Sequence, residues 1–483
     1  MSLIKCHHID FFLLLKDFID TMTIWTPILD SALPKYLALA QAIEEAINKG
    51  ELKPEDKLPP QRRLADALRV TIGTISRAYS EAERRGLVTA KTGSGTYVRT
   101  NNNVNAVDDE MAQDIAGKID MQAAFAPEGP QIKMLSRAMT SMAESEQLLD
   151  NLLNYAPELG YSNHRNSFQQ WLTTEPVALK DCDFLLTHGG QHAISVAINA
   201  LCREGDIILT EDLVFPGILA AAQDKGVNVI SIAMDVQGIM PDKVLQACQR
   251  HKPRMIYLTP NSQNPCGTQL SIERRQALVD ICRAHNVLIL EDDVQFIASK
   301  DKPKSMQELA PEQSIYLSSF SKRFSGAMRI GFLVAPHAIY NKIRLSLRAS
   351  SWTNSPILIH WLCQWMDNGE LAKLELWLAA EMSTRQALAK QHLSAWASNS
   401  QQTSFNLWLE LPPGWLSHEF VAQAKTQGVL VRSADDYRAG QQIPSPAIRL
   451  CLSRPKTHLQ LTDALIIIKT ILQQGPSLKE AVM

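Results

Sequence analysis

The sequence predicts an α/β protein of two domains, a small winged helical domain followed by a large domain built on a mostly parallel sheet. Three observations support this prediction. Short β-branched runs alternate with helical patterns over residues 116–478, three helical patterns and a strand–turn–strand occupy residues 31–100, and polar side chains directly follow several predicted strands. A chain of 483 residues also exceeds what one ordinary hydrophobic core organises.

The composition is that of a globular protein, with 45% hydrophobic residues, 20% charged residues and a net charge of −2. The charge is unevenly distributed, since residues 34–100 hold 12 Lys and Arg against 8 Asp and Glu. A basic segment on an acidic body is expected of a nucleic-acid-binding appendage. No apolar run approaches the roughly 18 residues of a membrane helix, so no membrane association is expected.

Eight cysteines lie scattered without a CxxC pair, which argues against a disulfide framework or a metal site and favours the reducing cytoplasm. The N-terminus resembles a signal peptide, but Asp10 interrupts its short apolar core and no small-residue cleavage site follows. We therefore expect residues 1–30 to be a disordered extension, or translation to start at Met22.

The first two helices of the small domain are set by apolar spacing. The first helix ends at Gly50, and its stripe consists of Leu37, Ala40, Ile43 and Ile47. The stretch LPPQRRLADALRV follows, in which two prolines precede a second short helix marked by Leu64, Ala65 and Leu68.

The third helix has Thr71 as its N-cap and Gly86 as its C-cap, with a core stripe of Ile75, Tyr79 and Ala82. The stretch LVTAKTGSGTYV then forms a strand, a turn containing Gly93 and Gly95, and a second strand. Three helices followed by a β-wing describe a winged helix-turn-helix, which binds double-stranded DNA. The alternative is a small helical cap whose charged face is merely solvated.

The motifs LPPQRRLA, VTIGTISRAY and GSGT resemble those of the GntR-type winged helix. The resemblance implies that Arg62 and Arg77 contact DNA, that Thr74 sits at the groove, and that Gly95 tips the wing. Ile72 and Gly73 depart from the pattern, because base readout usually uses polar side chains at these positions. Either the operator is unusual, or specificity rests on Arg77 and the wing.

A polar, aperiodic linker is predicted over residues 101–115, and the large domain over residues 116–478. Its predicted strands are DFLLT, DIILT, NVISI, RMIYLTP, VLILED, SIYLSSF and RIGFLVAP, with helical patterns between most of them.

Polar residues gather where four of these strands end. HGGQ follows DFLLT, TPNSQNPCG follows RMIYL, EDD follows VLIL, and SFSK follows IYLS. Ligands of such sheets bind at the carboxyl ends of the strands. A lysine there, Lys322, with an aspartate, Asp292, from another strand suits a Schiff base to pyridoxal 5'-phosphate (PLP), whose phosphate Ser319, Ser321 and Arg329 can bind.

At these residues the large domain resembles fold-type I aminotransferases over nearly its whole length. The resemblance implies that Gly190 and Gln191 cradle the phosphate at a helix N-terminus, that Phe215 stacks on the cofactor ring, and that Asn264 binds the ring hydroxyl. It makes Asp292 the partner of the pyridine nitrogen and Arg449 the clamp for an amino-acid carboxylate. Tyr155 matches a tyrosine that reaches the other subunit's cofactor, which implies a homodimer.

The same resemblance exposes two departures. A tyrosine often follows the pyridine aspartate, but Val294 and Gln295 stand there, and Phe215 replaces a commoner tyrosine. Taken singly, several of the residues that match the aminotransferase pattern could have purely structural roles. Phe215 could be a core residue, Asn264 a turn residue, Arg449 half of a surface ion pair and Gly190 a turn glycine.

The two domains together resemble MocR-type transcriptional regulators. The implied function is effector-responsive DNA binding by a PLP-binding regulator, whose large domain senses a small amine, an amino acid or PLP itself. Two alternatives are an aminotransferase with an accessory DNA-binding domain, and a regulator whose large domain only dimerises.

Overall fold

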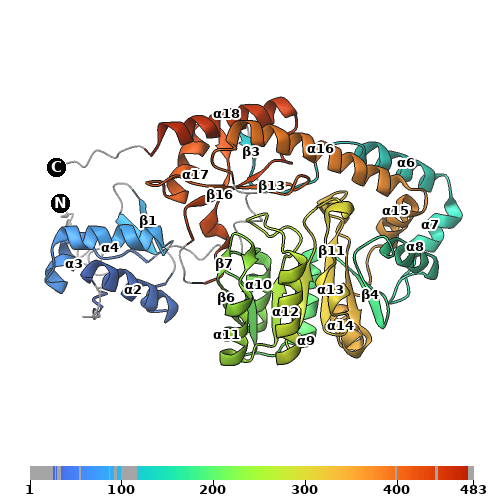
Figure 1. The fold of residues 1–483 in the computed structure, drawn as a ribbon, viewed down its shortest axis with the longest axis horizontal. Helices are drawn as coiled ribbons and strands as arrows, with labels where there is room; N and C mark the ends of the chain where they lie inside the picture. Colours follow the sequence, from blue (N-terminus) through green and yellow to red (C-terminus); the bar gives the residue numbers. More distant parts are fainter. Residues whose placement is uncertain are drawn as a thin grey trace, which may run out of the picture. The chain divides into compact units, whose positions relative to one another are not determined.

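The computed structural model describes residues 25–27, 29, 34–53, 56–85, 87–91, 95–98, 117–397, 400–440 and 444–476 (Figure 1). Two compact units divide between Asp109 and Glu110. The predicted linker over residues 101–115, Met22, and most of the predicted extension over residues 1–30 lie outside the described residues.

The N-terminal unit consists of three helices and a two-stranded antiparallel wing. Its elements are α2 (Lys35–Asn48), α3 (Gln61–Leu68), α4 (Ile72–Arg84), β1 (Val88–Lys91) and β2 (Gly95–Val98). Ile75, Tyr79 and Ala82 of α4 are buried as predicted, and the Thr71 side chain caps the helix by accepting a hydrogen bond from the Thr74 amide. Gly86 and Gly93 lie outside the described residues.

The buried stripe of α2 is wider than the predicted one. Ala40 and Ile43 are fully buried, but so are Leu39 and its neighbour Ala38, whereas Leu37 is only half-buried. The predicted stripe is confirmed for Ala40 and Ile43, whereas Leu37 and Ile47 are only half-buried. Helix α2 packs against α4, and its buried face also includes Leu39 and Ala46, so that face is broader than the predicted stripe.

The C-terminal unit is built on a seven-stranded sheet in the order β4-β12-β11-β10-β9-β5-β6. Its strands are β4 (Cys182–Thr187), β5 (Ile207–Glu211), β6 (Asn228–Ile232), β9 (Met255–Leu258), β10 (Leu288–Asp292), β11 (Ser314–Ser319) and β12 (Gly331–Pro336). They correspond to the seven predicted runs. Only β12 is antiparallel to its neighbours, so the mostly parallel sheet is confirmed.

Alternate residues of the strands face opposite helical layers. Tyr257 and Leu290 pack with α9 (Gly190–Leu201), α10 (Pro216–Lys225) and α14 (His337–Ser350). Ile256 and Ile289 pack instead with α11 (Pro241–His251), α12 (Ile272–His285) and α13 (Met306–Leu309). Because the sheet is buried on both faces, its strands are continuous apolar runs rather than alternating ones.

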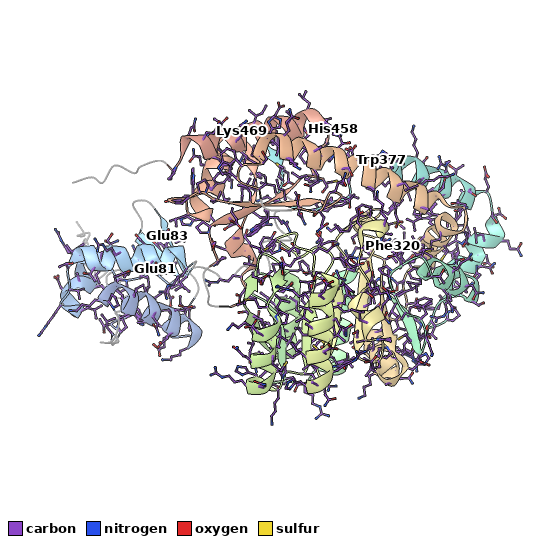
Figure 2. The ribbon with its side chains drawn as sticks, viewed as in Figure 1. Glu81, Glu83, Phe320, Trp377, His458 and Lys469 are labelled. Carbon is purple, nitrogen blue, oxygen red and sulfur yellow. The ribbon has the colours of Figure 1, made fainter. Side chains whose placement is uncertain are left out.

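A smaller sheet, β13 (Asn406–Glu410), β16 (Ala447–Cys451) and β15 (Arg432–Ser433), packs against α16 (Glu370–Leu393), α17 (Ser417–Thr426) and α18 (His458–Gln474). A parallel pair, β14 (Val429–Leu430) and β3 (Ile119–Asp120), lies beside it. Figure 2 shows His458 and Trp377 on this layer, where His458 contacts Glu381 of α16 at 2.9 Å. The remaining long helices are α6 (Gln131–Ala143), α7 (Glu146–Leu153), α8 (Ser162–Leu172) and α15 (Pro356–Asp367).

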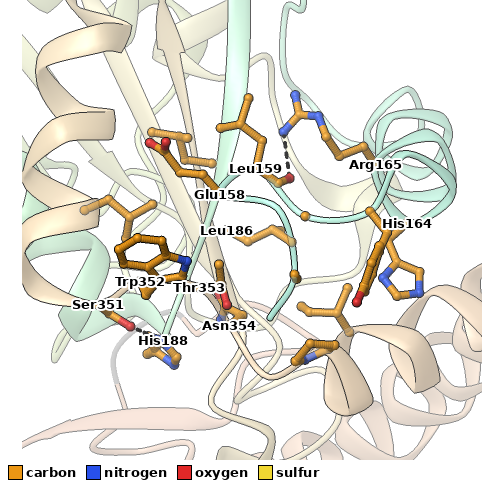
Figure 3. Close-up of a pocket in the computed structure, with 17 residues that line it drawn as sticks. Glu158, Leu159, His164, Arg165, Leu186, His188, Ser351, Trp352, Thr353 and Asn354 are labelled. Atoms are coloured by element: carbon orange, nitrogen blue, oxygen red, sulfur yellow. Dashed lines mark hydrogen bonds between the residues drawn. The ribbon is translucent and has the colours of Figure 1, made fainter. Parts of the chain in front are cut away.

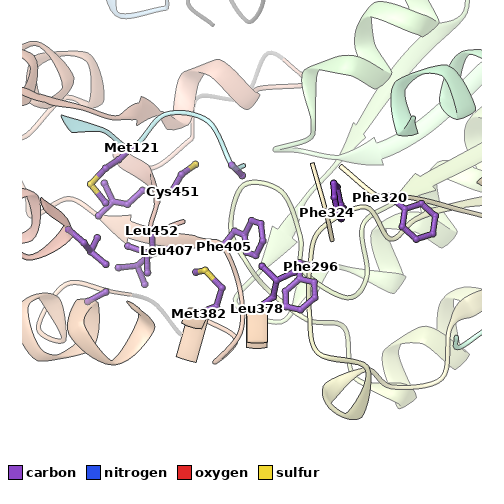
Figure 4. Packing of buried hydrophobic residues seen from close by; sticks show 14 of the residues in the cluster. Met121, Phe296, Phe320, Phe324, Leu378, Met382, Phe405, Leu407, Cys451 and Leu452 are labelled. Atoms are coloured by element: carbon purple, nitrogen blue, oxygen red, sulfur yellow. The ribbon is translucent and has the colours of Figure 1, made fainter. Parts of the chain in front are cut away.

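One hydrophobic cluster joins the smaller sheet to the large one. It contains Phe405 and Leu407 of the small layer, Met382 of α16, and Phe296 and Phe320 next to the large sheet (Figure 4). The segments that follow β10 and β11 are therefore packed against the small layer. In the part of the chain that the structure describes, no helix combines the length and the apolar character that crossing a bilayer requires.

Candidate functional site

The predicted site residues of the large sheet lie at one edge. Strands β4, β9, β10 and β11 run parallel, so the residues after them emerge on the same side. Asp292 ends β10, Lys322 follows β11, and Gly190 follows β4. Asp292, Arg329 and Arg449 all influence the pKa of Lys322, so these four charged groups share one electrostatic environment.

Lys322 is half-buried, and its ammonium donates a hydrogen bond to the backbone oxygen of Ala124. Its Nζ lies 5.6 Å from the centre of the Phe125 ring. Removal from water lowers the pKa of Lys322 to about 8, and the like charges of Arg449 and Arg329 act in the same direction. A lysine with this pKa is neutral in an appreciable fraction of molecules near neutral pH, which an amine nucleophile requires.

Asp292 is a buried carboxylate with two partners. Its Oδ2 accepts from the Tyr257 hydroxyl at 2.6 Å, and its Oδ1 accepts from the Val294 amide at 2.9 Å. Burial raises the pKa of Asp292 to about 6, while the Tyr257 bond opposes that rise. Sequence reasoning missed Tyr257 because it reads as an ordinary buried strand residue, and no polar signal surrounds it.

Two glycines, Gly189 and Gly190, lie beside Arg329 at the start of α9. Gly189 has a φ of 84°, and Arg329 Nη2 donates to the His188 backbone oxygen at 3.0 Å. A Cβ on Gly190 would lie 2.7 Å from Val294 Cγ2, and one on Gly331 would lie 2.7 Å from the Gly189 carbonyl carbon. Side chains are therefore excluded from a helix N-terminus beside an arginine, an arrangement that fits a phosphate.

Two serines lie beside this cradle. The Ser319 and Ser321 hydroxyls are 2.9 Å apart, and Ser319 also donates to the Ile330 backbone oxygen at 3.1 Å. The Gln191 side chain does not point into open space, because its Nε2 donates to the Gly217 oxygen at 2.8 Å. Phe215, next to Gly217, is half-buried at the start of α10.

Arg449 of β16 comes from the smaller sheet and meets residues of the large one. Its Nη1 donates to Asn264 Oδ1 at 2.8 Å, its Nη2 donates to the Gln122 backbone oxygen at 2.5 Å, and its guanidinium lies 4.9 Å from the Tyr437 ring centre. Its Nε is buried and meets no hydrogen-bonding partner among the described residues. Gln122 and Ala124 were missed because they act through backbone oxygens.

Tyr155 stands apart from these residues. Its side chain is 90% exposed, and its ring lies 6.5 Å from that of Trp352. Trp352 lines a small pocket with Glu158, Leu159, Arg165 and His188 (Figure 3). His188 contacts Ser351 at 2.6 Å there, but Lys322, Asp292 and Arg449 do not line this pocket.

The N-terminal unit carries the predicted DNA-binding residues on two helices and the wing. Arg62 of α3 and Arg77 of α4 are exposed, and Thr74 is half-buried with its hydroxyl 2.9 Å from that of Thr71. Gly95 begins β2 with a φ of 123°, and a Cβ there would lie 2.7 Å from Lys57 Cε. The glycine therefore lets Lys57 pass close to the wing backbone.

The chain is similar to known proteins in both units. Residues 124–465 match the family model "Aminotransferase class I and II", and residues 35–98 match "Bacterial regulatory proteins, gntR family". The HTH-type transcriptional regulator YdeF of Bacillus subtilis is 28% identical over 459 residues, which cover 93% of this chain and 96% of that protein. The bovine mitochondrial kynurenine/alpha-aminoadipate aminotransferase is 26% identical over 274 residues, covering 50% of this chain and 64% of that protein.

Solved aminotransferases share the fold of the large unit. The kynurenine aminotransferase of Pyrococcus horikoshii superposes with a TM-score of 0.69 at 18% identity, covering 78% of this chain and 95% of that one. The alpha-aminoadipate aminotransferase of Thermus thermophilus, complexed with N-(5'-phosphopyridoxyl)-L-leucine, has a TM-score of 0.65 at 19% identity, covering 82% and 98%. The family implies PLP as the cofactor, and the cradle and Lys322 fit it. The chain belongs to the aminotransferase class I and II family and joins that domain to an N-terminal gntR-family winged helix, the architecture of MocR-type regulators.

Proposed function

We propose that the chain is a transcription regulator that binds an operator through its winged helix and senses a small amine or amino acid, or PLP itself, at Lys322. The observation that supports this best is the pairing in one chain of a basic helix-turn-helix unit with a strand-edge lysine site. The DNA-binding role is supported by the gntR-family match and by the exposure of Arg62 and Arg77. YdeF, which bears a regulator's name, aligns along nearly its whole length.

Each side chain of the site has a distinct role in this proposal. PLP supplies an electrophilic aldehyde and an electron-accepting ring when it is bound. Lys322 would offer its amine to that aldehyde, and the Asp292 carboxylate would neutralise a protonated ring nitrogen. The backbone of Gly190 and Gln191 would hold the phosphate, together with Ser319, Ser321 and Arg329. Phe215 would stack on the ring, and Asn264 would bind the ring hydroxyl.

The effector's carboxylate is assigned to Arg449. Its Nε is buried and donates no hydrogen bond to the described residues, and its Nη2 donates to the backbone oxygen of Gln122. An anion offers a charged acceptor in place of that neutral one, which strengthens the hydrogen bond roughly twofold. Lys322 likewise gives its ammonium to the Ala124 oxygen. A ligand that takes over both cations therefore removes two of the hydrogen bonds that hold the segment containing Gln122 and Ala124, and leaves the bond from Cys451 Sγ to the Gln122 oxygen at 3.2 Å.

That segment lies close in the sequence to the stretch that leads to the DNA-binding unit. It follows β3 (Ile119–Asp120), and β3 follows the stretch of chain that joins the two units. A change in the hydrogen bonding of Gln122 is therefore only a few residues from the connection to the winged helix. This proximity supports a regulator in which ligand exchange at Lys322 repositions the DNA-binding units. A homodimer, with Tyr155 of each protomer serving the other's site, would place two winged helices on paired half-sites.

A second candidate function is an aminotransferase with an accessory DNA-binding unit. Lys322, Asp292 and Arg449 are the minimal groups such an enzyme uses, and all three share one electrostatic environment. The similarity to the bovine kynurenine/alpha-aminoadipate aminotransferase favours this alternative over a purely structural large domain.

The deciding experiment combines a spectrum with an operator-binding assay. Purified protein with PLP should absorb near the visible edge, Lys322→Ala should lose that band, and Lys300→Ala, which changes an exposed lysine, should keep it. Amines and amino acids are then screened for a spectral change that is accompanied by a change in operator affinity. A spectral response without any effect on DNA binding, together with rapid turnover of an amino acid and a keto acid, would favour the enzyme.

A further inference from the structure

The exposed face of α4 carries one unusual side chain. Ile75, Ala78, Tyr79 and Ala82 are buried on the core side of the helix. The opposite face consists of Ile72, Gly73, Ser76, Arg77 and Ser80. Ile72 is 46% exposed and is the one large apolar residue among the described residues of that face.

The polar groups around Ile72 are already engaged. The Thr71 hydroxyl accepts from the Thr74 amide at 3.2 Å and lies 2.9 Å from the Thr74 hydroxyl. Gly73, between them, has no side chain. The first turn of α4 therefore projects an aliphatic side chain, where a donor or an acceptor would be needed to form a hydrogen bond with a base edge.

The surroundings of this turn are cationic rather than apolar. Lys35 and Tyr36 of α2 line an open hollow together with Thr71, Gly73, Thr74 and Arg77, and Ile72 stands between two of these residues in the sequence. Positive side chains beside a helix N-terminus suit a phosphate backbone, which orients a protein on duplex DNA without reading its sequence. Charge complementarity therefore favours DNA as the molecule that covers Ile72.

We propose that Ile72 is a specificity-determining residue that contacts the C5-methyl group of a thymine in the major groove. The inference rests on the proposed DNA-binding function. The thymine methyl is the apolar group that the major groove displays, and aliphatic side chains contact it. Ile72 thus distinguishes a T·A pair from the other pairs by burying a methyl group instead of by hydrogen bonding.

The test starts from duplexes selected by the full-length protein, with PLP, from a pool of randomised DNA. Each thymine of the selected site is then replaced singly by deoxyuridine, which removes only the methyl group. We expect one thymine, or a symmetry-related pair, to lose about fourfold in affinity per methyl. Ile72→Ala should bind the thymine and deoxyuridine duplexes equally, whereas Ser76→Ala, on the same exposed face, should keep the difference.

A converse variant makes the test independent of a loss of function. Ile72→Arg should shift the preferred base at that position to guanine, whose O6 and N7 accept two hydrogen bonds from arginine. The inference is overturned when no methyl matters, or when the same methyl matters equally in wild type and Ile72→Ala. A protein that enriches no sequence from the pool would overturn the proposed DNA-binding function itself, which separates that failure from the failure of the Ile72 assignment.

Discussion

Replacing Tyr257 by Phe should weaken PLP binding in a manner that depends on pH. The Tyr257 hydroxyl donates to Asp292 at 2.6 Å and opposes the rise that burial causes in the pKa of that carboxyl. A hydrogen bond to a charged group contributes about 1.5–3 kcal/mol, which corresponds to a pKa change of about one to two. Losing the bond should therefore raise the pKa of Asp292 from about 6 to between roughly 7 and 8.

The expected loss of affinity follows from the ionised fraction of Asp292. At pH 7 that fraction falls from about nine-tenths to between roughly one half and one tenth, so PLP affinity should fall about twofold to tenfold. At pH 9 Asp292 is ionised in both proteins and the difference should nearly vanish.

The assay is a spectral titration of apo-protein with PLP between pH 6 and 9. Tyr316→Phe is the matched control, because the Tyr316 hydroxyl donates to Asp293, the neighbouring carboxylate, instead of Asp292. A deficit of the Tyr257 variant that stays constant across this pH range would refute the reasoning. An equal pH-dependent deficit in Tyr316→Phe would refute it as well.

Three further predictions concern DNA, assembly and turnover. Arg62→Ala and Arg77→Ala should each weaken operator binding, lower the salt slope of log K by about one, and leave the PLP spectrum unchanged; unchanged affinity in both would remove the assigned DNA contacts. Sedimentation should give a dimer, and Tyr155→Phe should weaken PLP binding, whereas a stable monomer with full cofactor occupancy would contradict the role of Tyr155. Amines should change the PLP spectrum within seconds, whereas transamination should take hours or fail. Val294, Gln295 and Phe215 stand where tyrosines would control the position of the cofactor ring, and misplacement of reacting groups by about one ångström costs on the order of a hundredfold in rate. Rapid multiple turnovers with any common amino acid would show that the chain is an enzyme as well.

The strands of the large sheet were predictable because burial on both faces leaves a continuous apolar run that ends abruptly in polar residues. The order of the strands was not, since the antiparallel placement of β12 between β4 and β11 depends on pairing between distant segments. The width of the α2 stripe was misjudged for a similar reason. Spacing identified a buried face, but contact with α4 extended that face to Leu39.

The site was predictable where it uses side chains with a chemical signature. Lys322 and Asp292 stand out at strand ends, and Arg449 was identified from a family resemblance because nothing in its local sequence marks it. Gln122 and Ala124 left no such signal, since any residue supplies a backbone oxygen. Tyr257 was hidden because its ring packs in the core while only its hydroxyl reaches Asp292.

The backbone oxygens of Gln122 and Ala124 compete with the proposed effector for Arg449 and Lys322. They occupy Arg449 and Lys322 in the structure, so the intrinsic affinity of an effector is multiplied by the fraction of molecules in which this competitor is disengaged. If an operator stabilises either position of the segment, it must change the effector's affinity by the same factor by which the effector changes the operator's. A compound that binds with equal affinity to both positions of the segment would therefore leave the operator affinity unchanged however tightly it binds, so potency as a regulator would have to be measured on DNA.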